Sequence, residues 1–338
     1  MGQEKLKTIN DIAKIANVSK ATVSKVINDY PDVNEKTKKK ILKIMREHNY
    51  WPNATARSLS TNKSLTIGIF DPSRLNNFFF REVFEGVEYT LGENGYDILY
   101  FTNKRWGETW VEFSFTEKCH NRNVDGVLLM GFGEINSKYF NNLLGSDIPT
   151  VAVDLDIVGK NASYVMSDNF NGARIAVDYL YNLGHRKIGM IMGPSGFKPA
   201  KDRFLGFQTK VNELGLKYNS DWVLSGQYGQ KTAFEYIDRI LKLEERPTAI
   251  FSEDVFSIGI INALKKRKMS VPNDFSLVGF DNVELSEHYD LTTIDQNQFA
   301  LGKAASELLL KILNKKNFSP VIMPAKLVER GSCLNLKE

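Results

Sequence analysis

The 338-residue sequence contains only two cysteines, Cys119 and Cys333, and no apolar run as long as a membrane span. Two cysteines so far apart form neither a disulfide framework nor a zinc motif, so we expect the thiols to be buried or inert. The first ten residues lack the apolar core of a signal peptide. These absences exclude a disulfide-rich secreted protein and a membrane-spanning protein, and they predict a cytoplasmic chain.

Common signatures of catalysis are absent too. The sequence has no G-x-x-x-x-G-K-[ST] phosphate loop, no G-x-S-x-G nucleophile elbow and no H-E-x-x-H zinc motif. Its four histidines are scattered, and His185, within "LGHRK", fits the exit of a helix better than an active site. We therefore expect no enzyme, no bound cofactor and no metal.

Positive charge is concentrated at the N-terminus. Residues 1–63 hold 13 lysines and arginines against 6 acidic residues, a net charge of +7, whereas the rest of the chain holds 31 against 34, or −3. A basic segment joined to a slightly acidic body indicates a polyanionic partner for that segment. A Lys-rich surface that is merely solvated is the alternative.

Three short helices are predicted in this basic segment. Thr8 and Asp11 form a capping-box-like start for the first helix. Asn17 tolerates the left-handed backbone of a sharp turn, and Ser19 can cap the second helix, expected from Lys20 to Asn28. A third helix is expected over residues 34–48. The apolar faces of the three helices consist of Ile9, Ile12, Ala13, Ala16, Val23, Val26, Ile27, Ile41, Ile44 and Met45.

Two short helices around a tight turn, braced by a third, form a helix-turn-helix unit whose second helix enters the major groove of DNA. Lys20, Ala21 and Lys25 face outward and suit base edges, because Lys can donate to guanine O6 and N7 and Ala can meet a thymine methyl. A three-helix bundle with a basic surface is the alternative. The side chains predicted to contact phosphates are those of Thr22, Ser24 and Asn28.

After Lys63, short apolar runs alternate with helical patterns, which is typical of parallel sheets with crossover helices. "FEGVEYTLGENG" (84–95) and "FLGFQTKVNELG" (204–215) share Phe, Gly, Glu and Gly at a constant offset. This weak repeat predicts two similar α/β lobes. The expected strands are "LTIGIF", "YDILYF", "DGVLLM", "PTVAVD", "KIGMIM", "WVLSG", "TAIFS" and "FSLVGF".

Ligands of open α/β sheets bind outside the carboxyl ends of strands, so two lobes would place both sets of strand ends around one cleft. Carboxylates and amides there can bridge sugar hydroxyls, and aromatic rings can cover the apolar face of a sugar. Asp168 and Asn169 could cap the following helix instead. The candidates that follow strands are Ser73, Asn77, Phe78, Phe79, Asp154, Asp168, Asn169, Glu253, Asp254 and Asp281.

Several ordered motifs resemble the lac repressor (LacI/GalR) family of bacterial transcription regulators over nearly the whole chain. They include "TINDIAKIANVSKATVSKVIND", "YWPNATARSLSTNKSLTIGIF", "DNFNGARIAVDYLYNLGHRKIGMIMGP" and "VPNDFSLVGFDN". The resemblance implies an all-α helix-turn-helix head and a two-lobed α/β effector domain, like periplasmic sugar-binding proteins, with parallel sheets. It adds Arg203 and Tyr228 to the cleft. Asn17 replaces a frequent Gly and Lys25 a frequent Arg, so the operator need not follow a family consensus.

The resemblance also implies three domains. These are a DNA-binding head over residues 1–51, a hinge helix and linker over 52–63, and an effector-binding and dimerisation domain over 64–338. Lobe 1 is expected at about 64–165 and 295–322, and lobe 2 at about 166–294 and 323–338. The hinge is too short for a stable isolated helix, and in the family it folds on DNA and opens the minor groove. A linker whose Leu packs on its own domain is the alternative. The hinge residues implied to contact DNA are Asn53, Ala56, Arg57 and Leu59, the last as the wedge.

These features predict an allosteric repressor of a sugar-utilisation operon, which binds palindromic double-stranded operator DNA and a small-molecule effector, in the simplest case a sugar. A purine, a phosphorylated sugar or a protein co-effector is the alternative, and a purine would favour aromatic walls on both of its faces. Only "GSCLNLKE" follows Arg330, too little for the leucine-heptad helix of family tetramers, so we expect a homodimer. A basic head without a signal peptide argues against a sugar-transport protein.

Overall fold

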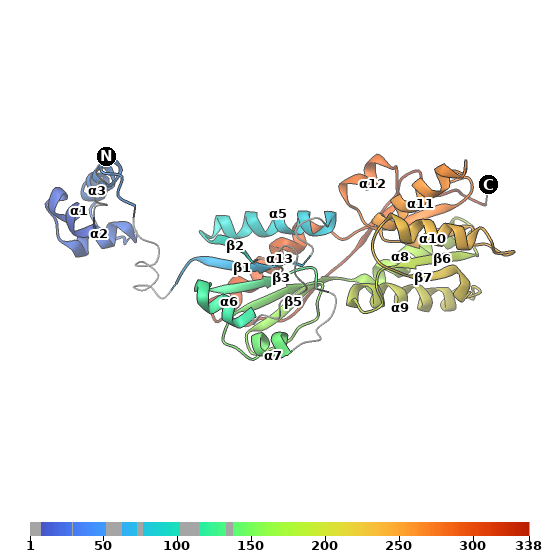
Figure 1. Ribbon diagram of the computed structural model, residues 1–338, viewed down its shortest axis with the longest axis horizontal. Helices are drawn as coiled ribbons and strands as arrows, with labels where there is room; N and C mark the ends of the chain where they lie inside the picture. The colour runs from blue at the N-terminus through green and yellow to red at the C-terminus, as the bar shows by residue number, and fades with distance from the viewer. Residues whose placement is uncertain are drawn as a thin grey trace. The chain divides into compact units, whose positions relative to one another are not determined.

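The computed structural model of the protein describes residues 8–28, 30–51, 63–72, 77–101, 115–132 and 138–337 (Figure 1). The chain divides into two compact units, Met1–Leu65 and Thr66–Glu338. Within the described ranges, no helix has the length and apolar character needed to cross a membrane.

The first unit contains the three predicted helices. Thr8 and Asp11 form the expected capping box, in which the Thr8 amide donates to Asp11 Oδ2 at 2.8 Å. Asn17 adopts the left-handed conformation, with φ 54° and ψ 51°. Ser19 Oγ then accepts from the Thr22 amide at 3.0 Å and caps the next helix. The tight turn therefore forms as predicted. The helices are α1 (Ile9–Ala16), α2 (Lys20–Ile27) and α3 (Glu35–Glu47).

The predicted apolar faces of the three helices meet in one core. Ile9 and Ile27 are half-buried, the other predicted core residues are buried, and Val18 packs on them from the turn. The outer face of α2 is left to solvent, as a DNA-reading helix requires. Its predicted base-reading residues Lys20, Ala21 and Lys25 are exposed, and Thr22, Ser24 and Asn28 are half-buried.

The second unit contains two six-stranded sheets, each with helices on both faces (Figure 1). The first sheet and its helices, lobe 1, comprise β1 (Thr66–Phe70), α5 (Phe78–Glu93), β2 (Asp97–Phe101), α6 (Phe115–Arg122), β3 (Gly126–Leu129), α7 (Lys138–Leu144), β4 (Thr150–Val153), β5 (Ala162–Ser167), α13 (Gln298–Leu313) and β11 (Val321–Met323). The second, lobe 2, comprises α8 (Asn169–Asn182), β6 (Ile188–Met192), α9 (Lys198–Glu213), η1 (Ser220–Trp222), β7 (Val223–Ser225), α10 (Gln230–Ile240), β8 (Ala249–Ser252), α11 (Asp254–Lys266), β9 (Ser276–Asp281), α12 (Glu284–His288), β10 (Thr293–Asp295) and β12 (Lys326–Val328).

The two sheets have equivalent topologies. Their strand orders are β11-β5-β4-β3-β1-β2 and β12-β10-β9-β8-β6-β7. The neighbouring strands are parallel except for the antiparallel pair of β10 and β12. The predicted fold class, a helical head followed by a two-lobed domain with parallel sheets, is confirmed.

Each sheet is the middle of three layers because alternate side chains of a strand point to opposite faces. On β1, Ile67 and Ile69 pack with α5 and α13, whereas Phe70 packs with α6 and α7. On β8, Phe251 packs with α8 and α9, and Ile250 packs with α10 and α11. Burial on both faces explains why these strands are continuous apolar runs.

The sequence repeat lies on equivalent helices, α5 and α9. A Cβ atom at Gly86 would lie 2.0 Å from the Phe299 carbonyl oxygen of α13, and one at Gly206 would lie 2.2 Å from the Phe170 carbonyl oxygen of α8. Both helices therefore approach the backbone of a neighbouring helix more closely than any side chain permits. Close helix packing is the physical reason for the repeated glycine.

The chain passes between the two sheets three times, after β5, β10 and β11. These strands end at Ser167, Asp295 and Met323, slightly beyond the boundaries expected at 165, 294 and 322. Multiple crossings leave the two sheets as lobes joined by short connections, an arrangement that allows hinge motion around a ligand. One exposed ion pair also links the lobes, between Arg81 Nη2 on α5 and Glu284 Oε2 on α12 at 2.6 Å.

Candidate effector-binding site

A cavity of about 600 Å³ lies between the two lobes, within the usual volume range of small-molecule sites. The carboxyl ends of parallel strands from both sheets face it, as the predicted topology requires. The lining residues are Pro72, Asn77, Phe78, Phe79, Phe80, Gly131, Phe132, Asp154, Phe197, Pro199, Arg203, Tyr228, Gly229, Gln230, Glu253, Val255, Ile258, Asp281, Val283 and Leu285.

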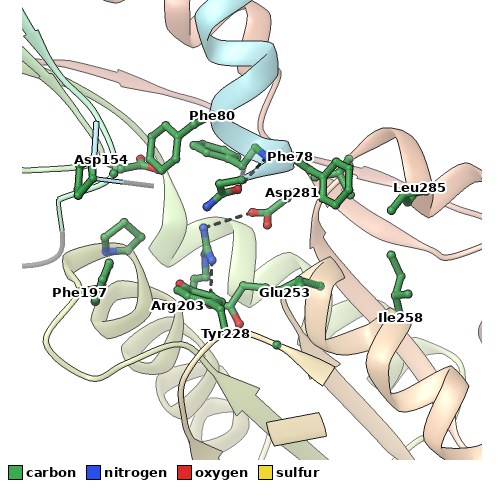
Figure 2. A pocket seen from close by; sticks show the side chains of 18 of the residues that line it. Phe78, Phe80, Asp154, Phe197, Arg203, Tyr228, Glu253, Ile258, Asp281 and Leu285 are labelled. Atoms are coloured by element: carbon green, nitrogen blue, oxygen red, sulfur yellow. Dashed lines mark hydrogen bonds and ion pairs between the residues drawn. The ribbon is translucent and has the colours of Figure 1, made fainter. Parts of the chain in front are cut away.

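Arg203, on α9, is the centre of the polar part of the cavity (Figure 2). Its side chain is buried, and its guanidinium donates from Nε to Asn169 Oδ1 at 2.8 Å and from Nη1 to Glu253 Oε1 at 3.0 Å. Nη2 lies 3.5 Å from Asp281 Oδ1, and the guanidinium carbon lies 4.1 Å from the centre of the Phe280 ring. A planar group with this many fixed partners is held in one orientation, which suits it to position a ligand.

Two aspartates leave equivalent strands with unusual backbone conformations. Asp154 follows β4 with φ 60°, and Asp281 ends β9 with φ 125°. Non-glycine residues rarely adopt positive φ, and such strain collects at functional sites. The strand equivalence and the shared strain indicate that both carboxylates are placed for a ligand or for Arg203.

The cluster has more acid than base. Among the described lining residues, Arg203 is the only cation, against Asp154, Glu253 and Asp281. Asp154 Oδ1 and Glu253 Oε2 are buried and have no hydrogen-bond partner within the described structure. Burial raises the pKa of Asp154 to about 6, with Arg203 offsetting part of the effect. Burial also raises the pKa of Asp281 well above its ordinary value.

Replacing Asp154 by Asn is expected to stabilise the protein at pH 7–8 and to leave it unchanged near pH 4. Because the folded-state pKa exceeds that of the unfolded chain, the folded protein binds more protons between pH 4 and pH 6. The stability contributed by Asp154 is therefore complete below about pH 4 and is lost as the pH rises through about 6. The neutral amide avoids this loss, which amounts to at most about 3 kcal/mol.

Thermal unfolding of the wild type and Asp154→Asn at several pH values would measure this effect. Asp147→Asn is the matched control, because the hydrogen bond from Lys160 lowers the pKa of that exposed carboxyl. The control variant should gain nothing at high pH. An equal gain in both variants would contradict the role of burial at Asp154.

Aromatic rings form the walls of the cavity and come from both lobes (Figure 2). Phe78 and Phe80 begin α5 in lobe 1, and Phe197 and Tyr228 belong to lobe 2. Phe78 and Tyr228 remain 45% and 44% exposed, although the Tyr228 ring stacks on Phe256 with centroids 5.4 Å apart. Exposed aromatic faces around a cavity can cover the apolar faces of a ring-shaped ligand.

Most of the predicted effector-binding residues line this one cavity. Asn77 also caps α5, since its Oδ1 accepts from the Phe79 amide at 3.0 Å. Their contact with an effector remains a prediction. Ser73 and the hinge residues Asn53, Ala56, Arg57 and Leu59 lie outside the described residues. The predicted residues found in the lining are Asn77, Phe78, Phe79, Asp154, Arg203, Tyr228, Glu253 and Asp281.

Three weaker candidates have structural roles and do not line the cavity. Asp168 caps α8, as the alternative expected, and accepts from the Asn171 amide at 3.0 Å. Asn169 supports Arg203, as described above. Asp254 is buried and accepts from the Val283 amide at 3.0 Å and from Thr293 Oγ1 at 2.6 Å, so it holds the loop after β9 against α11.

The sequence prediction missed much of the apolar lining. Phe132 and Phe197 come shortly after β3 and β6, so the rule that located Asp154 would also have located them. Val255, Ile258 and Leu285 lie on α11 and α12. No sequence signal distinguishes these helix residues from ordinary core positions, because only the packing of the lobes turns them toward a cavity.

The surroundings of His185 and of the two cysteines agree with the structural histidine and the inert thiols that the sequence predicts. His185 is buried, its Nδ1 lies 2.8 Å from Thr248 Oγ1, and its Nε2 lies 3.1 Å from the Leu334 carbonyl oxygen. It therefore joins the residue before β8 to the C-terminal segment. Burial raises the pKa of both Cys119 and Cys333 to about 12, which keeps the thiols protonated and unreactive.

Comparison with known proteins agrees with this architecture. The family described as bacterial regulatory proteins, lacI family, matches residues 8–53, and the periplasmic binding protein-like domain matches residues 177–333. The transcriptional repressor PurR of Vibrio campbellii is 35% identical over 91% of this chain and 92% of its own length. PurR of Vibrio cholerae is 32% identical over 97% of this chain and 98% of its own.

Among solved structures, the lac repressor dimer bound to operator and the anti-inducer ONPF aligns with a TM-score of 0.82 and 25% identity, covering 98% of this chain and 100% of that chain. The similar proteins are transcriptional repressors, in agreement with the expectation of a regulator and not an enzyme. From its sequence motifs, its fold and its relatives, the chain belongs to the lacI family of bacterial regulatory proteins and is a DNA-binding transcription regulator.

Proposed function

We propose that the protein is a homodimeric repressor that binds a palindromic operator through α2, and that the cavity between its lobes binds an uncharged, hydroxyl-rich effector, a neutral sugar. The cluster of Arg203 with Asp281 and Glu253 at the strand ends supports this class of ligand most directly. Sugar hydroxyls both donate and accept hydrogen bonds, so adjacent hydroxyls can serve a guanidinium and a carboxylate at once.

The charge of the cavity argues against a phosphorylated sugar. A phosphate group is best held by free cations or by several amide donors. The single cation of the described lining, Arg203, is already occupied by Glu253, Asp281 and Asn169. A phosphate would add a further negative group to the acid excess, whereas a neutral polyol supplies the donors that buried carboxylates need.

A purine base is the second candidate. Phe78 and Phe80 on one lobe and Phe197 and Tyr228 on the other are the aromatic walls that a flat heterocycle favours (Figure 2). The acidic and amide-bearing residues of the lining suit a neutral sugar better than a purine, but the aromatic residues beside them support a purine. The relatives that carry the name PurR point the same way.

Regulation follows from the position of the cavity. Asp154 and Phe80 belong to lobe 1, whereas Arg203 and Tyr228 belong to lobe 2, so a ligand that contacts both sets stabilises one relative position of the lobes. In a family dimer this would move the two first lobes and change the pairing of the hinges on DNA. A coupling of about 1–3 kcal/mol between effector and operator is typical of linked sites.

Thermal unfolding in the presence of monosaccharides, disaccharides, sugar phosphates, purine bases and nucleosides tests the effector class. A ligand at about 100 times its Kd raises the free energy of unfolding by roughly 2.7 kcal/mol, which a melting curve detects. We expect a neutral sugar to raise the melting temperature of the wild type but not of Arg203→Lys. The same sugar should change the affinity of the wild type for operator DNA. If only a purine raises the melting temperature, the effector is a purine and not a sugar. A shift without any change in operator affinity would contradict the regulatory role of the cavity.

A further inference from the structure

The Lys25 ammonium on α2 forms an ion pair with the carboxylate of Asp32, which follows the helix. The pair lies on the surface, with the two side chains 47% and 55% exposed. The hydrogen bond from Lys25 holds the pKa of Asp32 below its ordinary value, so the carboxylate is charged at neutral pH. Within the described head, Lys20, which is also exposed on α2, has no ion-pair partner. One of the two lysines predicted to read DNA, Lys25, is therefore already ion-paired with Asp32 in the DNA-free protein.

The backbone on both sides of Asp32 is fixed. The Tyr30 amide donates to the Lys25 carbonyl oxygen at 3.0 Å and closes the end of α2. Val33 packs on the core of the head, and the Asn34 side chain caps α3 by accepting from the Lys36 amide at 2.8 Å. Asp32 is therefore held beside Lys25 by the fold, and the carboxylate stays next to any DNA that Lys25 reaches.

A lysine ammonium has three N–H donors, so Lys25 can keep one on Asp32 and direct another at a neutral acceptor. Guanine O6 and N7 are such acceptors and do not repel the carboxylate. A phosphate is itself an anion, and it must either displace Asp32 or lie against it. The pair therefore weakens phosphate contacts of Lys25 more than base contacts.

We propose that Asp32 is a specificity-determining residue, which keeps Lys25 from phosphates and so favours operator over non-specific DNA. The inference rests on the proposed role of α2 in reading the operator. It concerns Asp32 acting through Lys25, and it does not require Asp32 to contact DNA.

Replacing Asp32 by Asn preserves the size of the side chain and removes its charge. Non-specific affinity should rise more than operator affinity, so that the ratio of the two falls roughly two- to fivefold, the range of one exposed ion pair. The salt dependence of non-specific binding should steepen by about 0.9 in log–log slope, one additional phosphate contact. Glu47→Gln is the matched control, because it also removes one negative charge and one lysine partner, Lys43, from the head.

The experiment uses the full chain, a duplex selected by that chain from a random pool, and a shuffled duplex of the same composition. In the background of Lys25→Ala, Asp32→Asn should change the affinity ratio no more than Glu47→Gln does. An unchanged ratio, or an equal change with and without Lys25, would overturn the proposal. A selective loss of operator binding would also overturn it, because Asp32 would then read a base itself. If no duplex is enriched, the proposed function fails and this inference fails with it.

Discussion

Replacing Arg203 by Ala is expected to lower the free energy of unfolding of the second unit by about 3–5 kcal/mol, the usual cost of removing one partner of a buried ion pair. The change leaves Glu253 and Asp281 without their cation and Asn169 without its donor. Glu253 and Asn169 are buried, so water cannot replace the lost partner there. Urea unfolding of the full chain would measure the loss.

Arg174→Ala is the matched control, since it removes an arginine from the same lobe. Arg174 donates to both carboxylate oxygens of Glu213, at 2.7 and 2.9 Å, but the pair lies at the surface and should contribute no more than about 1 kcal/mol. Equal losses of unfolding free energy in the two variants would show that the buried ion pairs of Arg203 stabilise the protein no more than an exposed pair does. Arg203→Lys should recover part of the stability, because it restores the charge, but not the fixed geometry that an effector requires.

Replacing Gly86 by Ala is expected to destabilise lobe 1 by about 3 kcal/mol or more, near the upper end of overpacking effects. The new methyl group would lie 2.0 Å from the Phe299 carbonyl oxygen, so α5 and α13 would have to move apart. Since Phe78 and Phe80 at the start of α5 line the cavity, the same change should also weaken effector binding. Thermal unfolding measures the first effect and ligand titration the second.

Gly92→Ala provides the comparison, because Gly92 lies on the same helix and a Cβ there meets no atom within 4 Å. This variant should be neutral or more stable by up to about 1 kcal/mol, since Ala favours a helix over Gly. Similar destabilisation at both positions would mean that helix propensity, and not the contact with α13, governs the result.

Local signals predicted the head almost completely. Each of its turn and capping features depends on only a few neighbouring residues, so the sequence alone could predict it. These features are the capping box at Thr8, the left-handed Asn17 and the Ser19 cap. Apolar periodicity then predicted which side of each helix is buried, because the apolar stripe of each helix must face the other two to form a common core. The exposed face of α2 follows from the same pattern.

Eight of the described strands were also predictable as apolar runs, whereas β5, β10, β11 and β12 were not. β5 (Ala162–Ser167) has mixed polarity and follows β4 without an intervening helix. β10, β11 and β12 have only three residues each and do not lie in a clear apolar run of the sequence. Such strands form because neighbouring strands supply the hydrogen bonds, and β11 and β12 lie far in the sequence from their partners β5 and β10.

The sequence by itself determined that Asp154 and Asp281 end strands of two similar lobes, because strand ends and internal repeats are local properties. It also determined which face of α2 is exposed. Only the tertiary structure decided that Arg203 joins Asn169, Glu253 and Asp281, that Ile258 and Leu285 face the same cavity, and that Asp32 holds Lys25. Each of these contacts joins segments whose separation in space depends on the packing of whole elements, and no local pattern records that packing.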